Sequence, residues 1–466
     1  MEGIEMQSVT EWAQLNFGSC DLGDKRRTKR LMQVAQQFAN NPSASFPDQN
    51  ELWKDLKAAY RLFDCDQVTF EAIARPHWQS TRSQAQGRCL VIGDTTEFDF
   101  GKNRQIEDIG ETGNGSGQGF LLHNALMVRA ETEELIGVAG QTIYYRRKGR
   151  KTTRKEHTFQ RMNRSRESEV WGKVIDDIGP PADGVEYVHV FDRGADNFEV
   201  YCRLLRTSSD WVIRAAKLNR YILCGETEER IQLKDYLPQL KPLGQYTLSL
   251  RARPGQAARE ALLEVRLGQI KIPRPQHVSP WVRGLKQPPI ATNVIEVVEV
   301  DAPDGVAPVH WVLFTSLPVR MFEDAWQIIG YYEQRWLVEE YHKALKTGCC
   351  SESRQFQAAC RLEALVGLTS VVAARLLKLK SLARTKPDTP AQRVVPKVWL
   401  EMLKLARKGL TRVHDLTVGQ FYREVAKLGG FLGRKHDGNP GWITIWRGWE
   451  KLNAFVYVAT KLKLTQ

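Results

Sequence analysis

The sequence predicts an α/β protein in which a core containing a β-sheet is flanked by two helical terminal domains. Three observations predict it. Residues 1–80 have helical apolar spacing, strand-like apolar segments begin near residue 86, and the chain after about residue 384 is helical again. With 466 residues, the chain is long enough for two or three domains with a large core. Its apolar content of 42% is that of a globular protein.

The charge balance indicates a polyanionic partner. Lysine and arginine number 67 against 54 acidic residues, which gives a net charge of +13. Nucleic acid is the expected partner, although composition alone does not exclude a membrane surface. The sequence contains no apolar run of about 18 residues and begins without a basic and apolar signal, so we expect a cytoplasmic protein with no membrane partner. The eight cysteines are scattered without a C-x-x-C pair, which indicates reduced thiols rather than zinc ligands.

The N-terminal helices include an unusually basic helix start. Asp24 is suited to cap the helix that follows it. Basic residues crowd the first turns of that helix, where the helix dipole disfavours cations: Arg26, Arg27, Lys29 and Arg30. Anion binding would explain the arrangement, and a solvated basic face is the alternative.

The middle of the chain alternates strands with polar segments. "GRCLVIGDTTEFDF" predicts a strand ending at Asp94, and two more strands complete an antiparallel meander. The basic run 146–166 predicts a loop that follows phosphates. "VEYVHVF" predicts a buried strand with Asp192 at its end, and Asp196 is expected to start the next helix. Short alternating strands over about 225–310 predict a β-rich insertion rather than a separate domain.

One segment, "YYEQRWLVEEYHKALKTG" over residues 331–348, predicts a helix with unusual composition. At 100° per residue, four of its side chains fall within an arc of about 60°: Tyr332, Arg335, Glu339 and Lys346. This stripe places a carboxylate between cations, where a core helix would present aliphatic residues. A solvated ion-pair face is the alternative interpretation.

Three carboxylates form the candidate catalytic group: Asp94, Asp192 and Glu339. Carboxylates that face one pocket repel one another, so a cation is expected among them. Oxygen-only ligands favour Mg²⁺ or Mn²⁺, and two such ions catalyse phosphoryl transfer. Each residue alone is weak evidence, because an aspartate after a strand is often a turn former and Glu340 could replace Glu339.

The order of strands, acidic strand ends and a carboxylate-bearing helix after an insertion resembles a ribonuclease-H-like (retroviral-integrase-like) fold. The spacing Tyr-x2-Arg-x3-Glu-x6-Lys is similar to the Y-R-E-K signature of DDE transposases in insertion-sequence family four. Segments along nearly the whole chain resemble the Tn-five type of that family: "LGDKRRTKRL", "GDTTEF", "FDRGAD", "HWVLFTSLPV", "QRWLVEEYHKALKTG" and "KLGGF" followed by "WRGWEKL".

The resemblance implies a cut-and-paste transposase that cleaves transposon ends through a hairpin intermediate and joins them to target DNA. It implies that Asp94, Asp192 and Glu339 hold two Mg²⁺ ions, with Mn²⁺ an alternative. It also implies DNA-contacting residues (Tyr332, Arg335, Lys346, Arg193, Arg214, Arg26, Arg27 and Arg30) and two base-flipping tryptophans (Trp311 and Trp336). The expected partners are double-stranded DNA and, on DNA, a second copy of the chain, in a bacterial nucleoid.

The same resemblance implies three domains: an end-binding domain over 1–80, a catalytic domain over 81–383 and a dimerisation domain over 384–466. The helical spacing of Trp442, Trp446 and Trp449 predicts either core packing or a subunit contact. Two other functions stay open. A structure-selective nuclease of the same fold would need the carboxylates but neither Trp311 nor Trp336, and a domesticated DNA-binding protein would need no catalytic triad.

Overall fold

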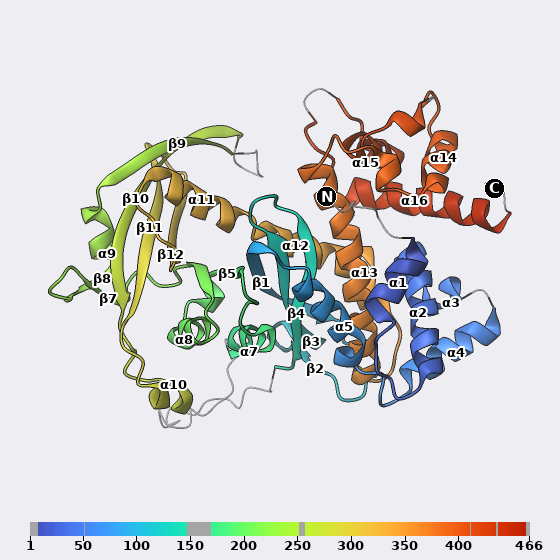
Figure 1. Ribbon diagram of the computed structural model, residues 1–466, viewed down its shortest axis with the longest axis horizontal. Helices are drawn as coiled ribbons and strands as arrows, with labels where there is room; N and C mark the ends of the chain where they lie inside the picture. The colour runs from blue at the N-terminus through green and yellow to red at the C-terminus, as the bar shows by residue number, and fades with distance from the viewer. Residues whose placement is uncertain are drawn as a thin grey trace.

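A twelve-stranded mixed sheet forms the centre of the computed structural model, with helical segments at both ends of the chain (Figure 1). The structure describes residues 8–50, 52–146, 169–250, 257–410, 412–434 and 437–462. The predicted mixed α/β architecture with helical termini is confirmed. Apart from Arg146, the predicted basic loop over 146–166 lies outside the described residues.

Five strands form the central part of the sheet in the order β4-β3-β1-β5-β6. β1 (Gly87–Asp99), β3 (Gly117–Arg129) and β4 (Leu135–Tyr144) form the predicted antiparallel meander. β5 (Val185–Phe191) and β6 (Asp210–Arg214) run parallel to β1. The almost continuous apolar sequence of β3 follows from its position, because helices cover both faces of the sheet there.

The strands of the predicted β-rich insertion continue this sheet beyond β6. β12 pairs with β6, and the strands that follow in space are β11, β10, β7 and β8, with β9 also pairing with β10. Their bounds, with those of the short strand β2 beside β3, are β2 Gly110–Thr112, β7 Tyr221–Cys224, β8 Glu229–Gln232, β9 Pro242–Leu250, β10 Arg259–Ile272, β11 Ile290–Val300 and β12 His310–Thr315.

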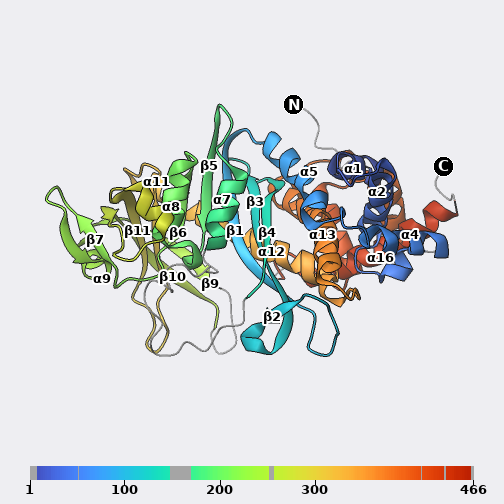
Figure 2. The ribbon, with the colours of Figure 1, turned by 90° about the horizontal axis from the view of Figure 1, so that it is seen from below.

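Helices cover the two faces of the central sheet. Adjacent residues of β4 distinguish the faces: Gly140 lies against Ile178, and the Gln141 side chain donates to the Tyr341 hydroxyl. On the Gly140 face lie α7 (Glu169–Ile178) and α8 (Phe198–Arg206). On the Gln141 face lie α12 (Trp336–Lys343) and the long α13 (Ala359–Thr385) (Figure 2). None of the helices among the described residues is long and apolar enough to span a membrane.

The N-terminal helices pack on α13 and β4 beside the sheet. The Asp24 carboxylate caps α2 as predicted, accepting from the Arg26 backbone at 2.8 Å. Buried Arg354 donates to the carbonyls of Pro42 and Ala44 and thereby ties these helices to the chain that follows α12. The helices are α1 Val9–Phe17, α2 Lys25–Asn40, α3 Phe46–Gln49, α4 Trp53–Phe63 and α5 Phe70–Ser83.

The C-terminal helices share a core with the end of α13. Trp446 and Trp449 are buried, and the Trp449 ring lies 4.3 Å from that of Trp399. The tryptophan stripe is therefore the packing face of its helix, which settles the alternative between core and subunit contact. The helices are α14 Lys397–Ala406, α15 Val418–Leu428 and α16 Trp442–Lys461.

The segment 331–348 is helical but, contrary to the prediction, it is not one helix. α11 (Phe322–Glu333) ends at a turn over 334–335, α12 follows, and a π turn (Ala344–Gly348) ends the segment. At the turn, the backbone bonds tighten to three-residue spacing, as in the bond from Leu337 to the Gln334 carbonyl at 2.9 Å. The constant rotation of 100° per residue therefore does not apply across the segment.

Candidate active site

Two of the candidate carboxylates lie at one level of adjacent strands. Each residue of β1 lies opposite the β5 residue 98 positions later, from Gly87 opposite Val185 to Ile92 opposite Val190. Continued by two residues, the same offset places Asp94 level with Asp192. Asp192 directly follows β5, as predicted.

The prediction that β1 ends at Asp94 is wrong, because the strand continues to Asp99. Its antiparallel partner β3 runs alongside it over that whole stretch, whereas β5 has already ended. Asp94 thus lies where β1 loses its partner on one side only. The end of the neighbouring strand leaves this carboxylate partly accessible, with its side chain 21% exposed.

Arg335 connects Asp94 to Glu339. Its Nη1 lies 3.3 Å from Asp94 Oδ2, and its Nη2 lies 2.7 Å from Glu339 Oε1. The turn at 334–335 places Arg335 at the start of α12, one helical turn before Glu339. Glu340 instead pairs with Lys380 of α13, so the structure selects Glu339 rather than its neighbour as the residue beside Asp94.

Asp192 begins a tight turn in which the neighbours of Gly194 leave little room for a side chain. Its Oδ1 accepts from the Gly194 backbone at 2.8 Å. A Cβ at Gly194 would lie 3.0 Å from Asp192 Oδ1 and 3.1 Å from the Trp171 ring, so a side chain there would press on the carboxylate. The predicted role of Asp196 is wrong: Asn197 caps α8, while Asp196 is buried and pairs with Arg220.

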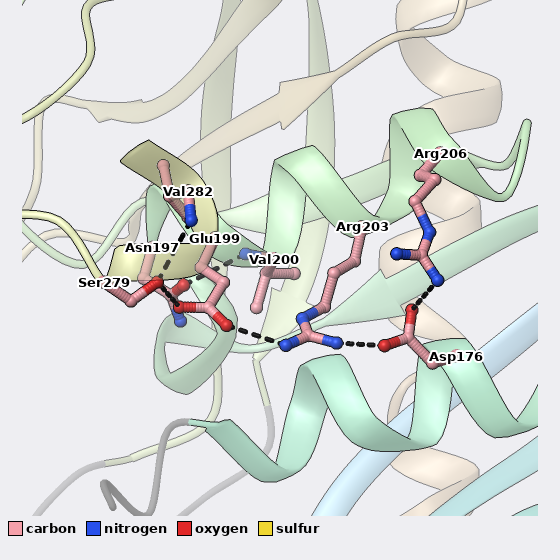
Figure 3. Close-up of polar contacts among 8 residues, drawn as sticks. All are labelled: Asp176, Asn197, Glu199, Val200, Arg203, Arg206, Ser279 and Val282. Atoms are coloured by element: carbon pink, nitrogen blue, oxygen red, sulfur yellow. Dashed lines mark hydrogen bonds and ion pairs between the residues drawn. The ribbon is translucent and has the colours of Figure 1, made fainter. Parts of the chain in front are cut away.

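The helix after Asp192 is anchored by an ionic cluster (Figure 3). Arg203 of α8 bonds both Asp176 of α7 and Glu199. Glu199 also accepts from the Ser279 hydroxyl at 3.0 Å, and the Trp281 ring lies 4.4 Å from the Arg203 guanidinium. The loop between β10 and β11 is thereby held against α8, which limits movement of the segment that begins at Asp192.

The electrostatics of Asp94 reflect its neighbours. Burial, together with the negative charges of Asp192 and Glu339, raises the pKa of Asp94 to about 6, against the lowering effects of the Thr95 backbone and Arg335. The carboxylates are therefore close enough to repel one another. Positive charge among these carboxylates therefore stabilises their ionised forms.

The raised pKa predicts that Asp94→Asn changes the pH dependence of stability. The folded protein holds a proton on Asp94 that the unfolded chain loses near pH 4, so the free energy of unfolding falls as pH rises from about 4 to 6. At pH 7.5, ionisation of Asp94 lowers the free energy of unfolding by roughly 1–3 kcal/mol, at 1.36 kcal/mol for each unit of pKa shift. The figure is discounted because the side chain is 21% exposed. Urea denaturation in EDTA should show that the variant gains stability relative to the parent between pH 4.5 and 7.5. An equal difference in the free energy of unfolding between variant and parent at both pH values would contradict the raised pKa of Asp94.

The donor set fits a hard divalent cation in its chemistry. Among the described residues, no three carboxylate, histidine or cysteine side chains lie close enough together to hold one metal ion as they stand. Arg335 supplies positive charge between two of the three carboxylates instead. Carboxylate oxygens are the ligands that Mg²⁺ and Mn²⁺ prefer, so Asp94, Asp192 and Glu339 are the residues that could hold such an ion.

Aromatic and basic side chains continue from this centre along α11 and α12. Tyr332 is buried, 6.0 Å from the Arg335 guanidinium and 6.1 Å from the half-buried Trp311 ring. Trp336 is 53% exposed on another side of α12, with Lys343 over its ring at 5.1 Å. Lys346 lies in the π turn and pairs with Glu352 at 2.9 Å, so it has left the stripe expected of a regular helix.

The other predicted basic residues are spread over three regions. Arg193 is exposed in the turn after Asp192, and Arg214 at the end of β6 donates to the His310 carbonyl. Arg26 is exposed at the start of α2. Two residues of the same helix already have partners within the chain: Arg27 bonds Gln67, and Arg30 pairs with Asp55.

A polar network that lies next to the carboxylates was not predicted from the sequence. Asn124 of β3 and Gln141 of β4 are buried polar side chains, and Asn124 contacts His342 of α12. Burial, together with the charges of Lys346 and Arg335, lowers the pKa of His342 to about 3, so this imidazole is neutral. The available signal was a polar side chain inside an apolar strand, because such a group must find a partner.

Comparison with known families assigns the two ends of the chain. Residues 9–68, which include α1 to α4, match the family described as transposase DNA-binding. Residues 371–463, from within α13 to α16, match the transposase Tn5 dimerisation domain. The protein is therefore a DNA transposase that carries a DNA-binding and a dimerisation domain. Both matches support a Tn5-like transposase.

Proposed function

We propose that this transposase works by cut-and-paste, nicking each transposon end, closing a hairpin on it, reopening it and joining it to target DNA. The observation that carries the proposal is the acidic centre itself, with Asp94 level with Asp192 and linked through Arg335 to Glu339. A protein that only bound DNA would gain nothing from assembling repelling carboxylates beside a polyanion.

We assign the following roles to residues of the protein. Asp94, Asp192 and Glu339 would hold Mg²⁺ or Mn²⁺, which when bound activates an attacking oxygen and stabilises a leaving oxygen. Arg335 has two acidic partners in the free protein and would contact a phosphate when DNA brings one beside it. Tyr332 and Lys346 would contact further phosphates of the transposon end.

The topology supports a ribonuclease-H-like core. An antiparallel meander, two further strands parallel to the first, and the order β4-β3-β1-β5-β6 are the arrangement that such a core requires. We assign this core, with its insertion, to residues 81–383. Residues 1–80 would bind the transposon end through the exposed start of α2, and 384–466 would pair two subunits, although the matched dimerisation family begins earlier, at residue 371.

A face of α16 is the proposed subunit contact. Phe455, Val458 and Leu462 are 47%, 50% and 63% exposed and recur at helical spacing. The buried tryptophans occupy the other side of this helix. An exposed apolar stripe on a helix of a dimerisation domain is the feature that a second copy would cover.

The direct test is cleavage of a DNA fragment that carries the ends of the native element. Purified protein with Mg²⁺ should nick the end, convert it to a hairpin and release a flush product, which denaturing gels separate. Nicked or fully cut DNA without any hairpin would instead favour the structure-selective nuclease. Binding without cleavage would favour the domesticated DNA-binding protein.

The tryptophans should separate the nick from the hairpin step. Hairpin closure bends the DNA end sharply and pushes a base out of the stack, at a cost of a few kcal/mol. An aromatic platform returns about 1–3 kcal/mol per stacked base, so Trp311→Ala or Trp336→Ala should slow hairpin formation by roughly one to two decades. The first nick precedes the bend and should be nearly unchanged.

A matched control for this prediction is Trp326→Ala, which removes a tryptophan of α11 that is 46% exposed. Both steps should proceed at the parental rate in this variant. An abasic nucleotide at the flipped position should partly rescue the two tryptophan variants. Normal hairpin rates in both variants would make Trp311 and Trp336 packing residues and would favour the nuclease.

A further inference from the structure

A row of polar side chains crosses the sheet at the level of the carboxylates. In the antiparallel register, Asp94 of β1 lies opposite Asn124 of β3, and Asn124 lies opposite Gln141 of β4. Residues at one level of paired strands point to the same face of the sheet. That face carries α12, because Asp94 contacts Arg335 and Gln141 donates to Tyr341.

The row holds α12 through two consecutive residues. The Asn124 side-chain nitrogen lies 3.0 Å from His342 Nε2, and Gln141 Nε2 lies 2.6 Å from Asn124 Oδ1 and 3.2 Å from the Tyr341 hydroxyl. Since Asn124 Oδ1 accepts from Gln141, the Asn124 amide group presents its donor to His342. His342 therefore accepts at Nε2.

The far end of the row is also fixed. Gln141 Oε1 accepts from Trp78 Nε1 of α5 at 3.1 Å, and the Tyr341 hydroxyl donates to the Ser370 carbonyl of α13 at 3.1 Å. The orientations of Asn124 and Gln141 are thus determined by neighbours on both sides. A buried polar network in which each group has a partner specifies one arrangement strongly.

We propose that Asn124 and His342 are positioning residues that set the rotation of α12 about its axis and so hold Glu339 toward Asp94. α12 has only 8 residues and is bounded by a tight turn and a π turn, so it has little helical stability of its own. Its orientation depends on side-chain contacts: Arg335 with Asp94 at one end, and Tyr341 and His342 with the polar row at the other. Glu339 lies between them. The inference rests on the proposed catalytic role of Glu339.

Four variants test this role. His342→Leu and Asn124→Leu remove the contact, and His342→Gln retains an acceptor for Asn124. The matched control is His77→Leu, which removes another buried histidine whose Nδ1 lies 2.6 Å from an asparagine, Asn16 of α1. At saturating end DNA and Mg²⁺, both contact-removing variants should nick about 10–100-fold more slowly, while their dissociation constants for the end stay within about twofold. His342→Gln should recover most of the rate, and His77→Leu should nick normally.

Hydrogen exchange of the DNA-free protein provides a readout that does not depend on cleavage. Asn124→Leu should increase exchange across α12, although the substitution is on β3, whereas His77→Leu should not. The double variant with Asn124→Leu and His342→Leu should nick no more slowly than the slower of the two single variants, because both substitutions remove the same contact. Parental nicking in His342→Leu, no recovery in His342→Gln, or unchanged exchange in α12 would each overturn the inference. If the parental protein nicks no end at all, the proposed function fails, while exchange in α12 still decides the positioning role.

Discussion

Replacing Asp94, Asp192 or Glu339 by alanine is expected to abolish strand cleavage while leaving transposon-end binding nearly intact. Each substitution removes a carboxylate from the centre in which Asp94 lies level with Asp192 and Arg335 bridges Asp94 and Glu339. Metal ions supply several kcal/mol of transition-state stabilisation, which corresponds to a loss of roughly 10³-fold or more at 1.36 kcal/mol per decade. DNA affinity comes mainly from phosphate contacts elsewhere, so it should change little.

Gel shift and cleavage on one protein preparation measure both quantities. The matched control is Glu340→Ala, because this neighbouring glutamate faces Lys380 of α13 rather than Asp94. It should cleave at close to the parental rate. Cleavage that survives in Asp94→Ala, Asp192→Ala or Glu339→Ala would remove that residue from the site, and loss of cleavage in Glu340→Ala would reverse the choice between the two glutamates.

Introducing charge on the exposed face of α16 should eliminate paired-end complexes but retain binding of single ends. Phe455→Asp combined with Val458→Asp would place two carboxylates in an apolar subunit contact. Truncating a hot-spot residue weakens an interface by about 2 kcal/mol or more, which is roughly 30-fold, and unpaired buried charge adds to the loss. Light scattering with end DNA should then show one protein on one end.

Point substitutions test this contact more cleanly than deletion of residues 384–466. The deletion would cut α13 and expose the core in which Leu379 and Leu382 pack with the C-terminal helices. The control is Leu432→Asp, which changes a leucine that is 66% exposed and lies outside α16. A complex of two proteins and two ends that survives in the α16 variant would show that subunits pair elsewhere.

Features set by neighbours in sequence could be predicted from the sequence. Asp24 caps α2 because a short acidic side chain reaches the first backbone amides of its own helix. Asp192 follows β5 because an apolar run and the turn after it are encoded within about ten residues. The insertion was predicted to be strands because alternating apolar residues mark half-buried strands wherever they pair.

Features set by residues that are distant in the sequence could not be predicted from the sequence. The length of β1 depends on β3, which continues beside it to Asp99 after β5 has ended. The break between α11 and α12 has no proline or glycine to announce it, and its position follows from packing. Asp196 looked like a helix cap, but a salt bridge to Arg220 draws it into the interior.

By itself, the sequence determined the fold class, the basic character and the identity of the candidate acidic residues, because composition, periodicity and motif spacing are local properties of the chain. Only the tertiary structure decided that Asp94 is level with Asp192, that Arg335 rather than Lys346 bridges the acidic residues, and that Asn124 contacts His342. These relations join residues about 100 to 240 positions apart. They depend on strand register and helix rotation, and a shift of one residue in either would point the side chains elsewhere.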